Sequence, residues 1–367
     1  MPEQRGRPCS NRDVLTRELD LTGSGNRLGL RQEGADPLRS EGDEDEVMRW
    51  VTTRWDRATR SALALAGCAL GCSAPADRGL TRPEAVRTTP YMQRDLTVLG
   101  LRLRYIDDGP TRPARRDRVL VLIPGHTSRI EEYDGLVPTL SQVHRVLVLD
   151  FPGSGYAEKP DREYSLAFYE DVLVAFLDEL GIAQCVLAGG SLGGNLVLRL
   201  GHRFPERFPR LVAWAPGSAW EAQPRLAALS RALAGYTLFW PTVWIQSRFW
   251  YSKDWPGRDR ALEDTFAYYR EVLSPGFVRM YWGMAADQVG QSLFPIAREI
   301  QQPTLLLWGD QDNGANMGEG VARLHQLLPH NEFHIFRGAR HSLAAETPER
   351  LAESIDEFLR RPASLMP

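Results

Sequence analysis

The chain has 367 residues, of which 43% are hydrophobic and 25% are charged, and its formal net charge is -3. These values exclude a wholly disordered chain and a collagen-like repeat, and the charge argues against a protein that binds nucleic acid through broad positive charge. Four cysteines are too few for a disulfide scaffold. No apolar run reaches the roughly 18 residues that a membrane-spanning helix needs.

Residues 1–47 come first, and they have no sustained apolar period. They are rich in glycine, arginine and acidic residues, and an acidic run over 41–46 lies near their end. Such a segment buries too little apolar surface to offset the entropy lost on ordering. We therefore expect a disordered extension, or a stretch that precedes the true start at Met48.

Residues 48–67 have the order of a secretory signal, in which a basic region precedes a short apolar run and small residues. The apolar run covers 61–67 and is followed by Cys68; the basic positions before it are Arg49, Arg54, Arg57 and Arg60. Leu65-Ala66-Gly67-Cys68 resembles the lipobox of bacterial lipoproteins, which implies a lipid on Cys68. The sequence departs from that pattern because the signal would start at residue 48 and its apolar run is short.

Two alternatives to this interpretation stay open. Cys72 offers a second frame, and the segment could instead form a short alanine-rich helix leading into the domain. With the lipid, residues 68–90 would be a tether and the protein a membrane-anchored lipoprotein of the cell envelope. A cytoplasmic location is the alternative.

From Asp95 onward, strand and helix patterns alternate. Continuous apolar runs are typical of strands buried on both faces, and they occur at 119–123, 146–149, 185–188 and 304–308. Helical patterns lie between them, and the alternation predicts an α/β fold with a mostly parallel sheet covered on both faces. We expect the core to comprise residues 91–216 and 297–361.

Residues 217–296 interrupt the alternation, because they contain no convincing strand. They are rich in tryptophan, tyrosine and phenylalanine. We expect a helical cap over one end of the sheet, whose aromatic side chains favour an apolar substrate of modest size.

Gly189-Gly190-Ser191-Leu192-Gly193 fits the motif G-x-S-x-G. It follows a predicted strand and opens a predicted helix, which is the context that a nucleophile elbow needs. The turn would point the Ser191 hydroxyl outward, and Gly189 and Gly193 would leave room for the bent backbone. Ser191 is therefore the candidate nucleophile.

A serine nucleophile needs a base and an acid that orients the base. His341 follows the last predicted strand at its carboxyl end, where ligands bind in open α/β sheets, so we predict it as the base. Trp308-Gly309-Asp310-Gln311-Asp312 supplies two candidate acids.

These motifs resemble those of the α/β-hydrolase superfamily, and the resemblance covers residues from about 90 to 361. It rests on the elbow, the acid turn, His341 followed by Glu346 and Pro348, and Asp150-Phe151-Pro152-Gly153-Ser154-Gly155. The resemblance implies an eight-stranded sheet, with the cap between the sixth and seventh strands. It also implies Asp312 as the acid; Asp310 is the alternative, and it could equally cap the turn.

The oxyanion hole of such an enzyme takes one backbone N–H from the residue after the nucleophile, here Leu192. The family's second donor loop begins H-G-x, whereas this chain has Pro124-Gly125-His126. His126 falls on the donor position, and its ring could contact substrate or pack.

We expect acyl transfer to water from an ester-like small molecule, without a metal or organic cofactor. The triad also occurs in the family's C–C bond hydrolases and cofactor-free haloperoxidases, so these stay as alternatives. A binding module without activity is disfavoured by the intact Ser191, Asp312 and His341. Neither nucleic-acid partners nor an oligomeric state follow from the sequence.

Overall fold

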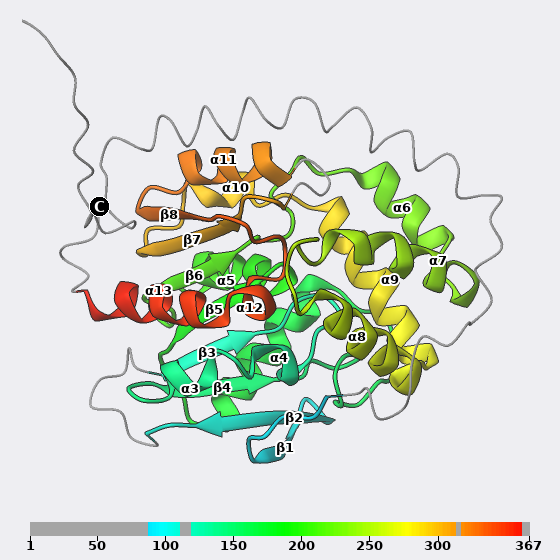
Figure 1. Cartoon of the computed structure of the whole chain (residues 1–367), viewed down its shortest axis with the longest axis horizontal. Helices are drawn as coiled ribbons and strands as arrows, with labels where there is room; N and C mark the ends of the chain where they lie inside the picture. Colours follow the sequence, from blue (N-terminus) through cyan, green and yellow to red (C-terminus); the bar gives the residue numbers. More distant parts are fainter. Residues whose placement is uncertain (1–86, 111–118, 313–316, 362–367) are drawn as a thin grey trace, which may run out of the picture. The chain divides into compact units, whose positions relative to one another are not determined.

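The computed structural model describes residues 87–110, 119–312 and 317–361. The predictions for residues 1–86, including the extension, the signal segment and Cys68, lie outside the described residues. From residue 87 on, the chain forms an eight-stranded sheet in the order β1-β2-β4-β3-β5-β6-β7-β8 (Figure 1). The pairs β1–β2 and β2–β4 are antiparallel and all others are parallel, which confirms the predicted fold class.

The strands match the apolar runs of the sequence closely. Their bounds are β1 Gln93–Val98, β2 Leu101–Asp108, β3 Val119–Ile123, β4 Arg145–Leu149, β5 Val186–Gly190, β6 Leu211–Trp214, β7 Thr304–Gly309 and β8 Asn331–Phe336. β5 begins one residue later than its apolar run and extends through Gly190. The first two glycines of the elbow motif therefore belong to the strand, where they pair with Ala213 and Trp214 of β6.

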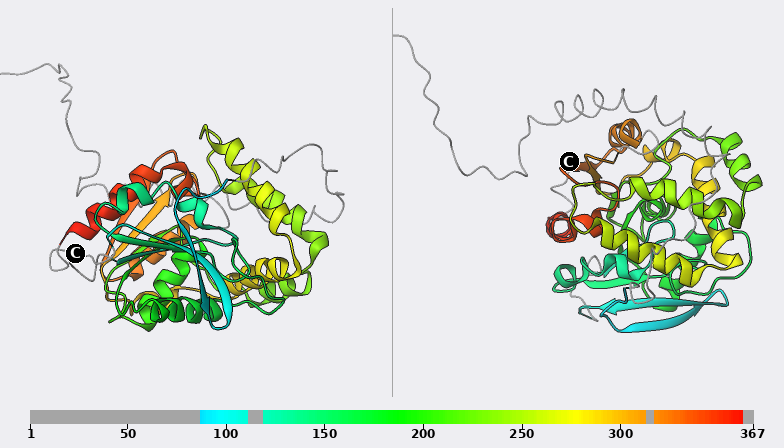
Figure 2. Two further views of the ribbon diagram at one scale, coloured as in Figure 1. Left: turned by 90° about the horizontal axis from the view of Figure 1, so that it is seen from below. Right: turned by 45° about the vertical axis from the view of Figure 1, so that its right-hand side comes forward.

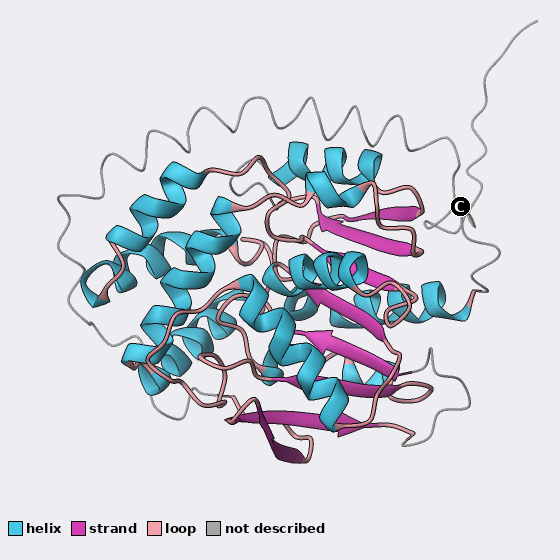
Figure 3. Ribbon diagram, turned by 180° about the vertical axis from the view of Figure 1, so that it is seen from behind, coloured by secondary structure: helices cyan, strands magenta, loops and turns pink. Residues whose placement is uncertain are grey.

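Helices cover both faces of the sheet (Figures 2 and 3). One face packs against α4 Leu166–Glu179, α5 Leu192–Arg203 and α11 Met317–Leu327, and the other against α3 Val137–Leu140 and α13 Pro348–Arg360. Successive side chains of a strand point to opposite faces. In β3, Val121 and Ile123 accordingly join the first core, and Leu120 and Leu122 join the second.

The segment between β6 and β7 is helical, with no strand in it. It contains α6 Pro224–Ala232, α7 Tyr236–Gln246, the 3-10 helix η4 Ser247–Phe249, α8 Arg258–Val272, α9 Pro275–Gly290 and α10 Phe294–Ala297. The Ser274 side chain caps α9 by accepting a hydrogen bond of 3.3 Å from the Phe277 N–H, as expected of serine at a helix start. Two further short elements, η3 Ile130–Tyr133 and α12 Leu343–Glu346, lie in loops of the core.

Aromatic packing accounts for many of the rings in the cap. Phe239 lies 5.8 Å from Phe277 and 5.0 Å from Tyr281 between ring centroids, both edge to face. This geometry is the favourable one for aromatic pairs. These buried rings hold α7 to α9, so they cannot all line a substrate pocket.

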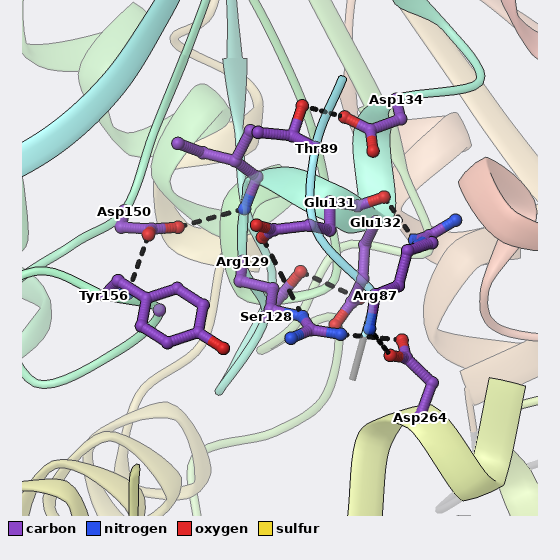
Figure 4. Close-up of polar contacts among 12 residues, drawn as sticks. Arg87, Thr89, Ser128, Arg129, Glu131, Glu132, Asp134, Asp150, Tyr156 and Asp264 are labelled. Atoms are coloured by element: carbon purple, nitrogen blue, oxygen red, sulfur yellow. Dashed lines mark hydrogen bonds and ion pairs between the residues drawn. The ribbon is translucent and has the colours of Figure 1, made fainter. Parts of the chain in front are cut away.

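A buried ionic cluster joins the core to the cap (Figure 4). Arg129, in the loop before η3, pairs with Asp264 of α8 at 2.7 Å, and its side chain is only 1% exposed. The Arg87 N–H donates to the same Asp264 side chain at 2.5 Å, and the Thr89 hydroxyl donates to Asp134 at 2.6 Å. The last residues of the predicted tether are therefore bonded to the domain. No helix in the described part of the chain is long and apolar enough to cross a membrane.

Candidate active site

Ser191 occupies a sharp turn between β5 and α5. Its φ of 55° and ψ of -118° place it in a region that non-glycine residues rarely adopt. Three backbone hydrogen bonds hold it there: its N–H donates to the Trp214 carbonyl at 3.0 Å, and its carbonyl accepts from Asn195 and Gly217 at 3.0 and 2.8 Å. Backbone strain held by surrounding bonds is typical of a nucleophile elbow.

The glycines of the motif are needed for close packing. A Cβ on Gly193 would lie 2.0 Å from the Ile123 carbonyl oxygen, and one on Gly190 would lie 1.9 Å from the Trp214 indole nitrogen. Only a hydrogen atom fits at either position. The elbow can thus turn directly beside β3 and β6.

The candidate acid and base meet at the carboxyl edge of the sheet. Asp312 follows β7 and His341 follows β8, and their Oδ2 and Nδ1 atoms lie 2.8 Å apart. The Asp312 side chain is only 2% exposed. An Nδ1–H donated to this carboxylate leaves the other ring nitrogen of His341 as the acceptor that a general base requires.

The second acidic candidate has a different partner. The Asp310 Oδ1 atom accepts a hydrogen bond of 2.7 Å from the Gly338 N–H, and so connects the turns after β7 and β8. The carboxylate that accepts a hydrogen bond from His341 is therefore that of Asp312, whereas Asp310 bonds to the turn after β8.

The surroundings of His341 favour its protonated form. Burial lowers the pKa of His341, but the charge and hydrogen bond of Asp312 raise it more, and the net pKa lies above the usual value of 6.5. The nearby Glu346 adds to the increase. Such stabilisation of an imidazolium is what a Ser-His-Asp arrangement needs while the histidine carries the proton.

The predicted oxyanion loop lies beside the serine. β3 pairs in parallel with β5, with Ile123 opposite Gly189, so the segments that follow the two strands leave the sheet side by side. A Cβ on Gly125 would lie 3.6 Å from the Ser191 Cβ. The Leu192 N–H lies in the first turn of α5, where a helix has no internal acceptor.

The His126 ring is engaged by the cap. Its Nε2 atom lies 3.0 Å from the Tyr281 carbonyl oxygen, and the His126 and Tyr281 rings stack at 5.1 Å. Burial lowers the pKa of His126 to about 4, while the hydrogen bond to Tyr281 opposes the shift. The ring is therefore neutral at pH 7, and Nε2 donates to the carbonyl. The ring thus packs against Tyr281, and a contact of this ring with substrate stays a prediction.

Sequence reasoning missed the cap segment beside the loops of Asp312 and His341. The Ser342 N–H, next to His341, donates to the Trp250 carbonyl at 3.0 Å. The Ser252 hydroxyl donates to Gln311 of the acid turn at 2.8 Å. No local pattern around these residues signals a contact with the candidate acid and base loops, because each contact joins distant parts of the chain.

No cluster of three or more histidine, cysteine, aspartate or glutamate side chains among the described residues could hold a metal ion. The expectation of a reaction without metal or organic cofactor stays a prediction.

Comparison with known proteins gives the family. Residues 118–348 match the model of the alpha/beta hydrolase fold. A 2-hydroxymuconate semialdehyde hydrolase from Pseudomonas putida is 30% identical over 286 residues, covering 75% of this chain and 96% of that protein. A 2-hydroxy-6-oxo-2,4-heptadienoate hydrolase, also from Pseudomonas putida, is 26% identical, covering 61% of this chain and 81% of that protein.

Among solved structures, the enol-lactonase from Burkholderia xenovorans LB400 superimposes with a TM-score of 0.63 at 22% identity. The match covers 73% of this chain and all (100%) of the lactonase, so it supports the fold. The family model spans most of the chain, and the first relative is similar over almost its whole length. The chain therefore belongs to the alpha/beta hydrolase fold family, and it is a hydrolase.

Proposed function

We propose that this hydrolase cleaves a carbon–carbon bond in a 2-hydroxy-6-oxo-dienoate, with Ser191 as nucleophile, His341 as base and Asp312 as the orienting acid. The observation that carries the proposal is the near full-length similarity to a 2-hydroxymuconate semialdehyde hydrolase at 30% identity. Further support is the hydrogen bond of 2.8 Å between His341 and Asp312, which lies at the sheet edge that also carries Ser191 and would orient the base.

The substrate must first become able to release carbon as a leaving group. The 2-hydroxyl of such a dienoate is an enol, and moving its proton to C5 gives a ketone at C2 and a C3–C4 double bond. A negative charge left on C5 can then spread through that double bond to the C2 oxygen. This delocalisation makes the C5–C6 bond cleavable.

Cleavage then follows the pattern of acyl transfer. Ser191 Oγ attacks the C6 carbonyl while His341 takes the hydroxyl proton, and the N–H groups of Leu192 and His126 stabilise the negative oxygen. When the C5–C6 bond breaks, its electron pair spreads through the dienolate to the C2 oxygen, and that oxygen takes the proton that His341 holds, so the enol of a shorter dienoate leaves. Water, activated by His341, releases the acyl group from Ser191, so that one water yields a carboxylic acid and a shorter dienoate.

Ester hydrolysis, the first expectation from the sequence, is now the second candidate. The same residues would perform it, because attack, oxyanion stabilisation and acyl-enzyme hydrolysis do not depend on whether carbon or oxygen leaves. The apolar and aromatic character of the cap favours this candidate for an apolar acyl group. Haloperoxidase-like chemistry has no comparable support.

The test compares both substrate classes with the same purified chain. We would measure kcat/KM for 2-hydroxymuconate semialdehyde and 2-hydroxy-6-oxo-2,4-heptadienoate, and for p-nitrophenyl acetate and butyrate, with Ser191→Ala as the control for background reaction. A shortened dienoate and a carboxylic acid, identified by mass spectrometry, are the expected products. Ester turnover without dienoate turnover would overturn carbon–carbon cleavage and leave the second candidate.

For the location, we propose a lipid anchor on Cys68 that attaches the enzyme to the bacterial cell envelope. The support is the order of basic region, apolar run and Leu65-Ala66-Gly67-Cys68. Stable anchoring takes more than one acyl chain, and a lipoprotein cysteine would carry several. Mass spectrometry of the mature N-terminus, beside a Cys68→Ser variant, tests this: an unmodified chain in the cytosol overturns the anchor, and a lipid on Cys72 corrects its position.

A further inference from the structure

Exposed apolar side chains gather in one part of the cap. Among the described residues, nine large hydrophobic side chains are exposed, and all but Met92 and Leu99 lie between residues 226 and 249. We call these seven the cap apolar face: Leu226, Leu229, Leu233, Tyr236, Trp244, Ile245 and Phe249. Scattered exposed apolar residues are ordinary, but a concentration of this kind marks an interaction surface.

Most of α6 faces away from the rest of the cap. Ala227 is the only buried residue of α6. It faces α9, where a Cβ on Gly290 would lie 3.1 Å from the Ala227 Cβ. Leu226, Leu229 and Leu233 are spaced by three and four residues, so they form one stripe along the helix. Figures 1 and 3 show α6 and α7 side by side at the outer end of the cap.

The segment that carries the cap apolar face contains basic residues and no acidic ones. Residues 222–253 contain no aspartate or glutamate, although the whole chain carries a net charge of -3. The basic residues of the segment are Arg225, Arg231, Arg248 and Lys253, and all four are exposed. Arg231 pairs with Asp287 of α9 at 3.3 Å. The Arg248 guanidinium lies 3.4 Å from the centre of the Trp244 ring, which puts positive charge directly beside an exposed indole.

The first described residues contact the cap. The Arg87 N–H is bonded to Asp264 of α8. This contact is independent of whether Cys68 carries a lipid.

We propose that the cap apolar face rests on a bilayer surface containing anionic phospholipid. Leucine and aromatic side chains in a segment that has no acidic residue of its own can enter the boundary between headgroups and acyl chains, and arginines beside them can contact phosphate groups. Trp244 and Tyr236 are of the types enriched at that boundary, because their rings combine an apolar body with a polar tip. This proposal concerns the place where the enzyme acts, and it is compatible with either candidate reaction.

Vesicle sedimentation tests the proposal on the full chain. Cys68→Ser/Cys72→Ser serves as the background, so that no acyl chain can be attached to either cysteine. We would compare this chain with the added triple change Leu226→Ser/Leu229→Ser/Leu233→Ser, on phosphatidylcholine vesicles with and without phosphatidylglycerol. Met92→Ser is the matched control, since Met92 is 73% exposed and lies outside the cap.

We expect the triple variant to lose binding to phosphatidylglycerol vesicles by roughly tenfold or more, while Met92→Ser binds like the background chain. Arg225→Glu should weaken binding more at low salt than at high salt, because screening removes the attraction to anionic lipid. The thermal unfolding midpoint of each variant shows that the fold is kept.

Three results would overturn the proposal. Equal binding of the triple variant and the background chain would place any membrane contact elsewhere, and equal binding to both vesicle types would remove the anionic surface as the partner. The third result comes from sedimentation velocity without lipid. If the background chain is a dimer and the triple leucine variant is a monomer, a second copy of the chain covers this face.

Discussion

Ser252 of the cap donates its backbone N–H to the Glu346 carboxylate at 2.9 Å, only a few residues from the predicted base His341. The same carboxylate accepts the Arg340 N–H at 3.1 Å. Glu346 therefore holds the cap segment and the histidine loop together. Because the Ser252 hydroxyl also bonds to Gln311, one cap residue contacts the loops of both the acid and the base.

This relationship predicts a pH-dependent stability. Burial raises the pKa of Glu346 from 4.5 to about 7, although backbone N–H donors from Ser252 and Arg340 oppose the shift. The folded protein thus binds more protons than the unfolded chain between these values. The free energy of unfolding should fall as pH rises from about 4.5 to about 7, by about 3 kcal/mol at 1.36 kcal/mol per pKa unit.

Glu346→Gln tests the assignment, because glutamine cannot ionise. Chemical denaturation from pH 4 to 8 should show a smaller slope for the variant than for the unchanged chain. Asp310→Asn is the matched control, since the Asp310 carboxylate also accepts a backbone N–H of a loop, that of Gly338. An unchanged slope in Glu346→Gln would show that other groups cause the pH dependence.

The triad assignment predicts a graded series of activities. Ser191→Ala and His341→Ala should lower kcat by about 10³ to 10⁶, since a nucleophile and its base act as a unit. Asp312→Asn should cost less, and Asp310→Asn least, because Asp310 bonds to Gly338 rather than to His341. Steady-state kinetics on the preferred substrate measures the series. A larger loss in Asp310→Asn than in Asp312→Asn would contradict the choice of acid.

The parts of this site that sequence reasoning predicted have local signals. Gly189–Gly193 is a contiguous motif between an apolar run and a helical period, and the structure has its strand and helix at those places. By contrast, β6 contains only Leu211–Trp214, which is too short to show a period of its own. Its place was implied only by the expected total of eight strands.

The contacts that position the site depend on the folded chain. Ser252 and Glu346 are separated by 94 residues, and Arg129 and Asp264 by 135. Ordinary serine, glutamate and arginine residues give no sign of such partners. The aromatic cap illustrates the same point, since composition suggested a pocket lining whereas Phe239 packs against Phe277 and Tyr281.

The pKa of His341 predicts the acidic limb of the pH–rate profile. Burial lowers this pKa, but Asp312 raises it to a value above the usual 6.5. A general base must be neutral, so kcat/KM should rise with pH through a midpoint above 6.5. The Asp312→Asn variant lacks the negative charge that raises the pKa of His341, whereas the burial that lowers this pKa remains. The midpoint should therefore move to lower pH, even as the maximal rate falls, and a midpoint that does not move would contradict the pairing.

The last prediction concerns two arginines on the same face of β2. Arg104 lies between Glu131 and Asp150, with contacts of 2.8 and 2.6 Å, and its side chain is 7% exposed whereas both acids are fully buried. Figure 4 shows those two acids in the core–cap cluster, where Asp150 also accepts the Tyr156 N–H at 2.7 Å. Removing the cation would leave Asp150 without its bonded counter-charge, and Glu131 with only Arg129, whose Nε atom lies 3.8 Å away.

Arg104→Met should therefore lower the free energy of unfolding by about 3–5 kcal/mol, the range typical of breaking a buried ion pair. Arg102→Met is the control, because Arg102 pairs with Asp95 at 3.0 Å while both side chains are at least half exposed. An exposed pair of this kind contributes about 0–1 kcal/mol. Urea denaturation at pH 7 measures both variants, and similar losses in the two would show that burial does not decide the contribution of these arginines.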